Sequence, residues 1–308
     1  MKTNDTITPS STNLTNIPNM PVIKALTPAE REKGVKDFMK RAAQFPTMNG
    51  HLIGNIDIRL LDVDLAYQRI PEDLNKLLDH FDIGKLSMLT ISYRDGKLYT
   101  IDGLHRIYAC LINHIQTVSV EVYTDLTQEA EAKLFATQDD GTTSLKPSES
   151  YKAHLLYGEP VDTAIHNITA KYGMDCLDED RTMRPALSAC RNIVKSKLGG
   201  KDALEWIFHI LYESKWTTDA YGCSDKNLNA LWAAYKDGIA LQKRNLKAYE
   251  ERLISVMRKY DMHIIQDYGK SLAFGGENRG FMKTALVNIA SGLTNEQNIA
   301  AYLKARHV

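Results

Sequence analysis

Apolar positions repeat with two different periods along the chain, and the change falls near residue 146. From residue 55 to residue 145, runs that alternate between apolar and polar residues are interspersed with stripes spaced three and four residues apart. Alternation is typical of half-buried strands, and the wider spacing is typical of amphipathic helices. Beyond residue 146 only the helical spacing remains. The first part is therefore predicted to be mixed, and the second all-helical.

Several runs in the first part predict strands of one small sheet. The run 56–63 (IDIRLLDV) alternates, as does 89–93, which is followed by Asp95-Gly96 and a return over 98–101. An Asp-Gly pair between two such runs is typical of a tight hairpin. Valines at 118, 120 and 122 predict a further strand. We expect these runs to pair in a mixed sheet flanked by short helices.

Helix-start signals separate these runs. Thr27-Pro28-Ala29-Glu30 supplies an N-cap, a proline at the first helical position and a capping-box glutamate. Pro71-Glu72-Asp73 opens a second helix, another follows Asp102-Gly103, and Thr127 caps a fourth. The apolar faces predicted for these helices are Val35, Phe38, Met39 and Ala42; Leu74, Leu77, Leu78 and Phe81; Ile107, Cys110, Leu111 and His114; and Ala130, Leu134 and Phe135.

The second part carries successive helical stripes, which predict a bundle whose apolar residues form the core. Combined with the first part, the fold class is α+β: a small mixed-sheet domain followed by an all-α C-terminal domain. We expect a disordered tail at 1–23, an N-terminal helix and linker at 24–54, the mixed-sheet domain at 55–145 and the helical domain at 146–308. The stripes are Leu187, Cys190, Val194; Leu204, Ile207, Phe208, Leu211; Leu228, Leu231, Trp232, Tyr235; and Leu246, Tyr249, Leu253, Val256, Met257, Tyr260.

Composition narrows the class of protein without assigning an activity. The chain has 308 residues, 38 basic against 38 acidic residues and 44% hydrophobic residues. No apolar run is long enough to span a bilayer, and the N-terminus lacks the layout of a signal peptide, so we expect a cytoplasmic protein without a membrane partner. A net charge of zero provides no global field that would attract nucleic acid.

The cysteine pattern excludes two common kinds of site. Cys110, Cys176, Cys190 and Cys223 form no CxxC pair and have no histidine at metal-ligand spacing. This argues against a disulfide framework and against a structural zinc site. We expect buried thiols.

The segment Tyr99–Arg106 carries the candidate chemistry, because a strand passes through a glycine into a helix. Amides at a helix start are unpaired and attract anions, and Gly103 would let a phosphate approach the main chain. His105 and Arg106 add side-chain donors, and the planar arginine fork suits phosphate. A plain loop with solvated first-turn side chains is the alternative interpretation of the same residues.

The order of motifs resembles the ParB N-terminal and sulfiredoxin-like superfamily, over roughly residues 55–150. The order is YQR (67–69), a helix, a hairpin, IDGLHR (101–106), a helix, a valine-rich strand, a helix ending in LFATQDD (134–140), and LKPSE (145–149). The chain looks most like bacterial and phage ParB-like proteins with a DGQHR-type box and a helical C-terminal region. We call residues 102–106 the box.

The resemblance implies a set of site residues. Gly103, His105 and Arg106 would grip phosphate, and Gln68 and Arg69 would lie over a nucleotide. Gln138 and Asp139 fall near the family's Glu-Asn pair, which faces magnesium and the phosphates, and Asp139 would be the better Mg²⁺ ligand. The alternative for 138–140 is a solvated helix end before a loop. If hydrolysis occurs, Asp102 or Asp139 would position water or metal.

Departures from the family limit what it implies. Leu104 stands where sulfiredoxins have their catalytic cysteine, and Cys110 lies on the apolar face more than one turn later, so sulfiredoxin chemistry is excluded. Centromere-binding ParB proteins end the box with two basic residues and have an arginine after the Glu-Asn pair. This chain has His105-Arg106 and only Thr142 and Thr143 there, and 151–199 shows no convincing recognition helix. Their CTP-driven clamp is therefore not assumed.

Basic residues of the helical part are candidates for contact with the DNA backbone. Two other features have a simpler interpretation: the glycine-rich loop 274–280 as an inter-helix loop, and the basic residues of 243–259 as a solvated helix face, because Glu250 and Glu251 interrupt them. The DNA candidates are Arg184, Arg191, Lys195, Lys197 and Lys201.

Three hypotheses follow. The first is a ParB-like protein that binds a nucleoside triphosphate with magnesium and works on or with DNA or a second copy of the chain, with or without hydrolysis. The second is a nuclease or small-molecule phosphotransferase on the same fold, which needs a positioned base and several metal-binding carboxylates. The third is a non-catalytic interaction module whose ancestral pocket is empty.

Overall fold

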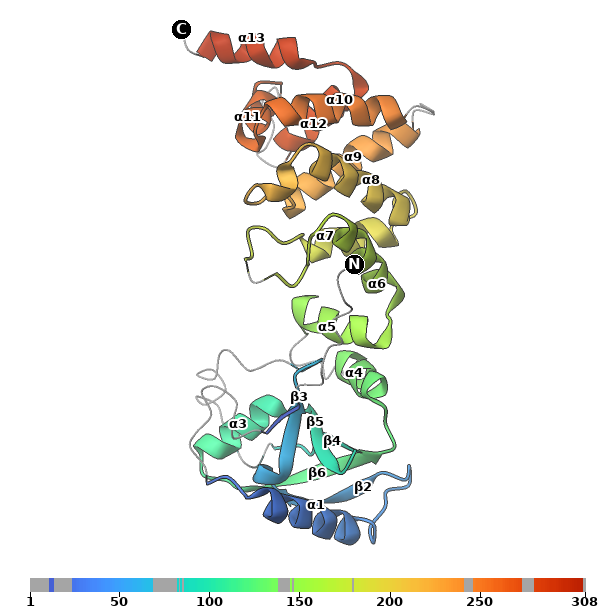
Figure 1. Ribbon diagram of the computed structural model, residues 1–308, viewed down its shortest axis with the longest axis vertical. Coiled ribbons are helices and arrows are strands. Elements are labelled where there is room, and N and C mark those ends of the chain that lie inside the picture. The colour runs from blue at the N-terminus through green and yellow to red at the C-terminus, as the bar shows by residue number, and fades with distance from the viewer. Residues whose placement is uncertain are drawn as a thin grey trace, which may run out of the picture. The chain divides into compact units, whose positions relative to one another are not determined.

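The computed structural model describes residues 11–13, 24–68, 82, 84, 86–137, 145, 147–178, 180–240, 246–272 and 280–306. The chain forms two compact units, 1–159 and 160–308. The first is α+β with a mixed sheet, and the second is helical (Figure 1), so the predicted fold class is confirmed. The first unit ends after helix α5 rather than at residue 145, because α5 packs against α4.

The sheet of the first unit has the strand order β1-β3-β5-β4-β6-β2. β3 pairs with β5 and β4 with β6 in parallel, whereas the β1–β3, β4–β5 and β2–β6 pairs are antiparallel. The elements are β1 (Ser11–Asn13), α1 (Pro28–Ala42), β2 (Leu52–Asp57), β3 (Leu61–Asp64), β4 (Leu89–Arg94), β5 (Lys97–Asp102), α3 (Leu104–Ile112), β6 (Thr117–Thr124), α4 (Gln128–Thr137) and α5 (Pro147–Tyr157).

Local signals predicted several of these elements well. The capping box at Thr27 and Glu30 starts α1, and Thr127 accepts a hydrogen bond from the amide of Ala130 at the start of α4. Asp95 and Gly96 both have positive φ, 52° and 75°, as the tight β4–β5 turn requires. The helix predicted from Pro71 lies outside the described residues.

Three expectations need correction. The run 56–63 is not one strand: a 3₁₀ turn at Ile58–Leu60, started by Asp57 accepting from the Arg59 amide, divides it into β2 and β3. Ser11–Asn13, expected in a disordered tail, pairs with the free edge of β3. His114 is exposed with φ 58°, because α3 ends at Ile112.

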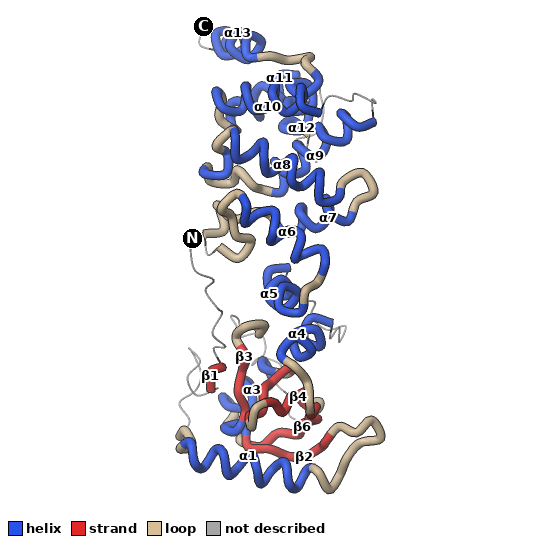
Figure 2. Tube along the Cα trace, turned by 45° about the vertical axis from the view of Figure 1, so that its right-hand side comes forward, coloured by secondary structure: helices blue, strands red, loops and turns tan. Residues whose placement is uncertain are grey.

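Two apolar clusters hold the first unit together. The larger lies between the sheet and helices α1 and α3, with Phe38, Ile91, Leu98, Ile107 and Val120 among its fully buried members. The smaller joins Tyr67 and Ile101 to α4 through Ala132 and Phe135, and to α5 through Ala153. Figures 1 and 2 show α4 beside the ends of β4 and β5. The residue that precedes the box is thus packed against α4.

The second unit consists of helices around an apolar core. The predicted stripes supply most of that core, including Leu204, Phe208, Leu231 and Leu253, all without exposed surface. The helices are α6 (Pro160–Lys171), α7 (Leu187–Lys195), α8 (Gly200–Glu213), α9 (Asp225–Ala240), α10 (Leu246–Lys259), α11 (Met262–Leu272), α12 (Phe281–Ser291) and α13 (Glu296–Arg306), with a 3₁₀ turn at Trp216–Thr218. Among the described residues, no helix combines the length and apolar character needed to cross a membrane.

Candidate functional site

The passage from β5 to α3 depends on Gly103. Its φ of 100° lies in the left-handed region, where residues with a side chain are strained. A Cβ at this position would also lie 2.4 Å from Leu89 Cδ2. Glycine is therefore required here both by backbone conformation and by the close approach of β4.

The start of α3 is the candidate anion site. Gly103 occupies the N-cap position, and no side chain caps the helix there. The first amides of a helix have no partner within the helix, and the helix dipole places partial positive charge at this end. Leu104 is buried, whereas His105 is half-buried on the same turn. The structure thus has a helix start without a side-chain cap directly after Gly103, and phosphate binding there stays a prediction.

Arg106 and Asp102 are paired with each other. The Arg106 Nη2 atom donates to the Asp102 carboxylate, one helical turn earlier. Its Nη1 atom donates to the Ser87 hydroxyl and, at 3.3 Å each, to the carbonyls of Ser87 and Met88. The sequence assigned the arginine to phosphate and the aspartate to catalysis. In this structure Arg106 connects the box to the segment before β4, and the Asp102 carboxylate accepts from Arg106 within the box.

Gln68 belongs to the frame behind the box rather than to its open side. The side chain is buried, and Nε2 donates to the carbonyls of Thr100 and Ile101 at 3.0 and 2.5 Å. The β4–β5 register shifts at this point, since Thr90 pairs with Asp102 but Ile91 pairs with Thr100. A bulge disrupts the ladder locally, and the Gln68 amide bonds to the strand there. The side-chain amide of Gln68, which was predicted to lie over a nucleotide, is thus bonded to β5 in this structure.

The remaining predicted site residues of this part lie outside the described residues. They are Arg69, Gln138 and Asp139, so the magnesium site assigned to Asp139 stays a prediction. A cavity of about 490 Å³ in the first unit lies elsewhere, between α1, β3 and the β4–β5 turn. Arg31, Asp62, Tyr93 and Lys97 line it, and no box residue does.

A buried charge network, which the sequence analysis missed, joins β3, β4 and α4 in the first unit. Arg94, the last residue of β4, donates from Nε to Glu131 Oε1 at 2.9 Å and from Nη2 to Glu131 Oε2 at 3.1 Å. The same Nη2 donates to Asp64 Oδ2 at 2.8 Å. Glu131 has no exposed surface and Asp64 is 1% exposed. One guanidinium thus joins a carboxylate at the end of β3 to a carboxylate of α4.

Other donors complete this network. Gln128 Nε2 donates to Asp64 Oδ2 at 2.7 Å, the Ala66 amide donates to Asp64 Oδ1 at 3.0 Å, and the Tyr67 hydroxyl donates to Glu131 Oε2 at 3.2 Å. Burial, and then the charges of Glu131 and Asp64, raise the pKa of Tyr67 well above its ordinary value. The phenol is therefore a permanent donor at neutral pH. The sequence signalled this network only through the positions of two acidic residues, Asp64 at the end of β3 and Glu131 within α4.

The DNA candidates of the second unit are placed in different settings. The Arg191 Nε atom donates to Asp162 Oδ1 at 2.8 Å, and Asp162 has no exposed surface. Arg191 therefore holds α7 to α6, and its assignment as a DNA-backbone residue stays a prediction. Lys195 and Lys197 are exposed and Arg184 is half-buried, so these three keep their candidate role.

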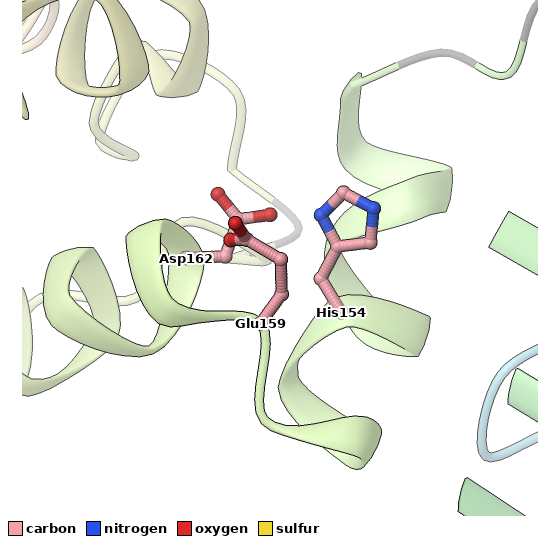
Figure 3. A group of neighbouring side chains, drawn as sticks. All are labelled: His154, Glu159 and Asp162. Atoms are coloured by element: carbon pink, nitrogen blue, oxygen red, sulfur yellow. The ribbon is translucent and has the colours of Figure 1, made fainter. Parts of the chain in front are cut away.

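The connection between α5 and α6 carries polar groups that we do not assign to a metal. Figure 3 shows His154 on α5, Glu159 in the connection and Asp162 in the first turn of α6. Acidic groups often gather without a metal, and the Asp162 carboxylate already accepts from Arg191. The contacts among the described residues explain this carboxylate without a cation.

The thiols are buried, as predicted. All four cysteines are free and buried, and burial raises the pKa of Cys110. A thiol with a raised pKa is a poor nucleophile at neutral pH. The position of Cys110 on the inner face of α3 agrees with the exclusion of sulfiredoxin-like chemistry.

Part of the chain matches a known family profile. Residues 66–192 match the profile of a family described as a family of unknown function, DUF6551. No curated protein and no solved structure matches the chain. The matched region begins next to Tyr67 and Gln68, contains the box and α4, and ends within α7.

Proposed function

We propose that this is a ParB-like nucleotide-binding protein, in which the start of α3 binds the phosphates of a nucleoside triphosphate together with Mg²⁺. The observation that carries the proposal is the uncapped start of α3 behind Gly103. A helix start of this kind offers oriented amides to an anion. The order of motifs around it, which resembles the ParB and sulfiredoxin-like superfamily, supports a nucleotide as the source of the phosphate.

In this proposal each residue of the box has a separate role. The amides that follow Gly103 bind phosphate oxygens, and His105 contributes from the first turn. Arg106 reaches the ligand by exchanging the Asp102 carboxylate for a phosphate, which suits its planar fork equally well. Asp102 is then released and becomes available to water or metal. Asp139 supplies the metal-binding carboxylate, and a bound Mg²⁺ would neutralise charge on the phosphates.

We further propose that the second unit contacts DNA. The exposed Lys195 and Lys197, with Arg184, can bind backbone phosphates of DNA. Such contacts do not distinguish one base sequence from another. Because the chain as a whole is neutral, such binding should be weak and sensitive to salt. A second copy of the chain is the other partner we consider, and we place this activity in the cytoplasm.

Calorimetry with nucleoside triphosphates and Mg²⁺ tests the proposal. The wild-type protein should bind at least one nucleotide, and Arg106→Ala should weaken that binding. Arg59→Ala is the matched control, because the side chains of the Arg59–Asp57 pair are 23% and 29% exposed and those of the Arg106–Asp102 pair are 22% and 34% exposed. Absence of heat with every nucleotide, from folded protein, would remove the proposal.

One observation favours the interaction module as a second candidate. The protein supplies the Arg106 guanidinium with acceptors of its own, at Asp102, Ser87 and Met88. If the pocket is vestigial, Arg106→Ala will leave partner binding unchanged while the protein remains folded. If phosphate recognition controls the partner, the same variant will weaken partner binding.

A further inference from the structure

The Arg94 network joins parts of the first unit that are distant in sequence. Asp64 ends β3, Arg94 ends β4 and Glu131 lies in the first half of α4. All four carboxylate oxygens accept a hydrogen bond from Arg94, Gln128, Tyr67 or the Ala66 amide. A buried network with every acceptor satisfied is rigid, and removal of one member leaves others unpaired at high cost. The distance between α4 and the end of β3 is therefore set by Arg94.

A short turn continues the connection from Asp64 to the box. The Asp64 carbonyl accepts from the amide of Gln68 at 2.9 Å, and the Asp64 carboxylate accepts from the amide of Ala66. These bonds fix the turn that places Gln68, which in turn donates to the carbonyls of Thr100 and Ile101. The strand held in this way leads directly into Asp102 and Gly103. A substitution of Arg94 should thus alter the backbone at the first turn of α3.

Apolar contacts make a second connection between the same elements. Ile101 and Tyr67 pack against Ala132 and Phe135 of α4, and the Tyr67 and Phe135 rings lie 5.8 Å apart. Tyr67 therefore contributes its ring to this contact and its hydroxyl to Glu131. Polar and apolar contacts thus hold the same helix, α4, to the turn 64–68 and to the end of β5.

We propose that Arg94, acting with Asp64 and Glu131, is a positioning residue for the phosphate site. It holds α4 against the turn 64–68, and that turn, through Gln68, sets the backbone that enters the box. None of the three side chains needs to contact the ligand. This inference rests on the proposed function, since it names the residues that shape the same site. Energetic coupling through such a chain of bonds requires a direct test.

The chain contains a close match for a control. Arg31 forms a two-point ion pair with Asp62, also on β3, at 3.2 and 3.0 Å. The side chains of that pair are 17% and 4% exposed, against 16% and 1% for Arg94 and Asp64. Arg31 lies on α1 and has no described bond to α4 or to the box. Arg94→Lys and Arg31→Lys therefore each remove guanidinium bonds to a buried carboxylate of β3, but only Arg94→Lys also removes bonds to α4.

The first readout is amide hydrogen exchange of the full-length chain without ligand, compared between variants that remain folded by circular dichroism. Arg94→Lys should speed exchange in residues 66–68 and 101–106, and Arg31→Lys should not. Glu131→Gln, with Asp62→Asn as its control, repeats the test with substitutions that preserve side-chain size. The inference is overturned if exchange in 101–106 is unchanged in folded Arg94→Lys and Glu131→Gln, or if both controls change it equally.

The second readout is nucleotide affinity by calorimetry in the presence of Mg²⁺. Arg94→Lys should weaken binding by about tenfold, within the usual range of coupling between sites, and Arg31→Lys should leave it unchanged. Equal affinity of the wild type and Arg94→Lys would overturn the inference. If the wild type binds no nucleotide, the proposed function fails, and the effect of Arg94 on the α3 start is then decided by hydrogen exchange alone.

Discussion

The two compact units bury charge in different ways. In the first unit, one guanidinium, Arg94, holds carboxylates from β3 and α4 inside the protein. In the second unit, Arg191 holds a single buried carboxylate, Asp162, between two neighbouring helices. The network of the first unit is bonded through Asp64 and Gln68 to the strand that leads into the box, whereas the Arg191–Asp162 pair joins α7 to α6. Buried charge thus has a local structural role in one unit and reaches the candidate site in the other.

Removal of the two arginines should produce the largest effects. Arg191→Met leaves Asp162 without its guanidinium and should lower the free energy of unfolding by about 3–5 kcal/mol. Arg94→Met leaves two carboxylates, Asp64 and Glu131, without their guanidinium. It should therefore lower the free energy of unfolding by at least as much. Urea unfolding measures both, and tryptophan fluorescence isolates the second unit, because Trp206, Trp216 and Trp232 all lie there.

Lys195→Ala is the control for the arginine variants, because this residue is exposed on the same helix as Arg191. It should change stability by no more than about 0.5 kcal/mol. A loss below about 1 kcal/mol in either arginine variant would show that the carboxylate finds another partner, contrary to the contrast drawn here.

The apolar core of the second unit can be tested with a pair of leucines. Leu204 has no exposed surface and Leu198 is 55% exposed. Leu204→Ala should lower the free energy of unfolding by about 2–5 kcal/mol through lost burial and a cavity. Leu198→Ala should change it by about 0.5 kcal/mol or less. Similar values for the two variants in fluorescence-detected urea unfolding would contradict the assigned packing.

Alkaline pH should weaken the second unit through its buried thiols. Burial, and then the nearby Cys176, raise the pKa of Cys223 from 9.0 to about 12. The unfolded chain then loses this proton at lower pH than the native chain, so stability is full below pH 9 and falls between pH 9 and 12. The slope for one such group is about 1.4 kcal/mol per pH unit.

Cys223→Ala should reduce that slope, measured by urea unfolding at a series of pH values. The absolute stability of this variant will also change because a buried group is removed. The slope is therefore the informative quantity, and an unchanged slope would mean that Cys223 ionises equally in both states.

The smallest expected effect concerns a helix start in the first unit. Thr27 Oγ1 accepts from the Glu30 amide at 3.3 Å, and Glu30 accepts from the Thr27 amide at 2.8 Å. Thr27→Ala should cost about 1 kcal/mol of stability, and Thr27→Ser, which retains the hydroxyl, should cost much less. Thermal unfolding followed by circular dichroism measures this. Equal loss in both variants would indicate that the methyl group, not the cap, matters.

Local sequence patterns predicted the fold better than they predicted the site. The capping box, the Asp95-Gly96 turn and the helical stripes depend on residues within one or two turns of each other. The division of 56–63 into two strands was missed because alternation does not report a short 3₁₀ turn. The buried face of α4 was placed at Ala130, Leu134 and Phe135. The structure buries Phe135 but leaves Ala130 and Leu134 half-buried, and it buries Glu131 and Ala132 instead.

For the candidate site, the sequence correctly located the strand-glycine-helix passage at Gly103, since backbone conformation there follows from residue type. It assigned Gln68, Asp102 and Arg106 to a ligand, and it gave no role to Arg94, Asp64 or Glu131. The side-chain bonds of Gln68 to β5 and those of Arg94 to Asp64 and Glu131 span 30 or more residues of chain, as does the bond between Tyr67 and Glu131. Periodicity carries no information about such partners.

The sequence by itself determined an α+β chain with a glycine at the start of a helix, because strand alternation, helix caps and left-handed turns are encoded locally. Tertiary structure alone decided that Arg106 bonds to Ser87 and Met88, that Arg191 pairs with Asp162 and that Arg94 joins β3 to α4. Those pairings depend on which elements pack together. A buried charge has lost its contact with water, so its partner must come from the element that is packed against it.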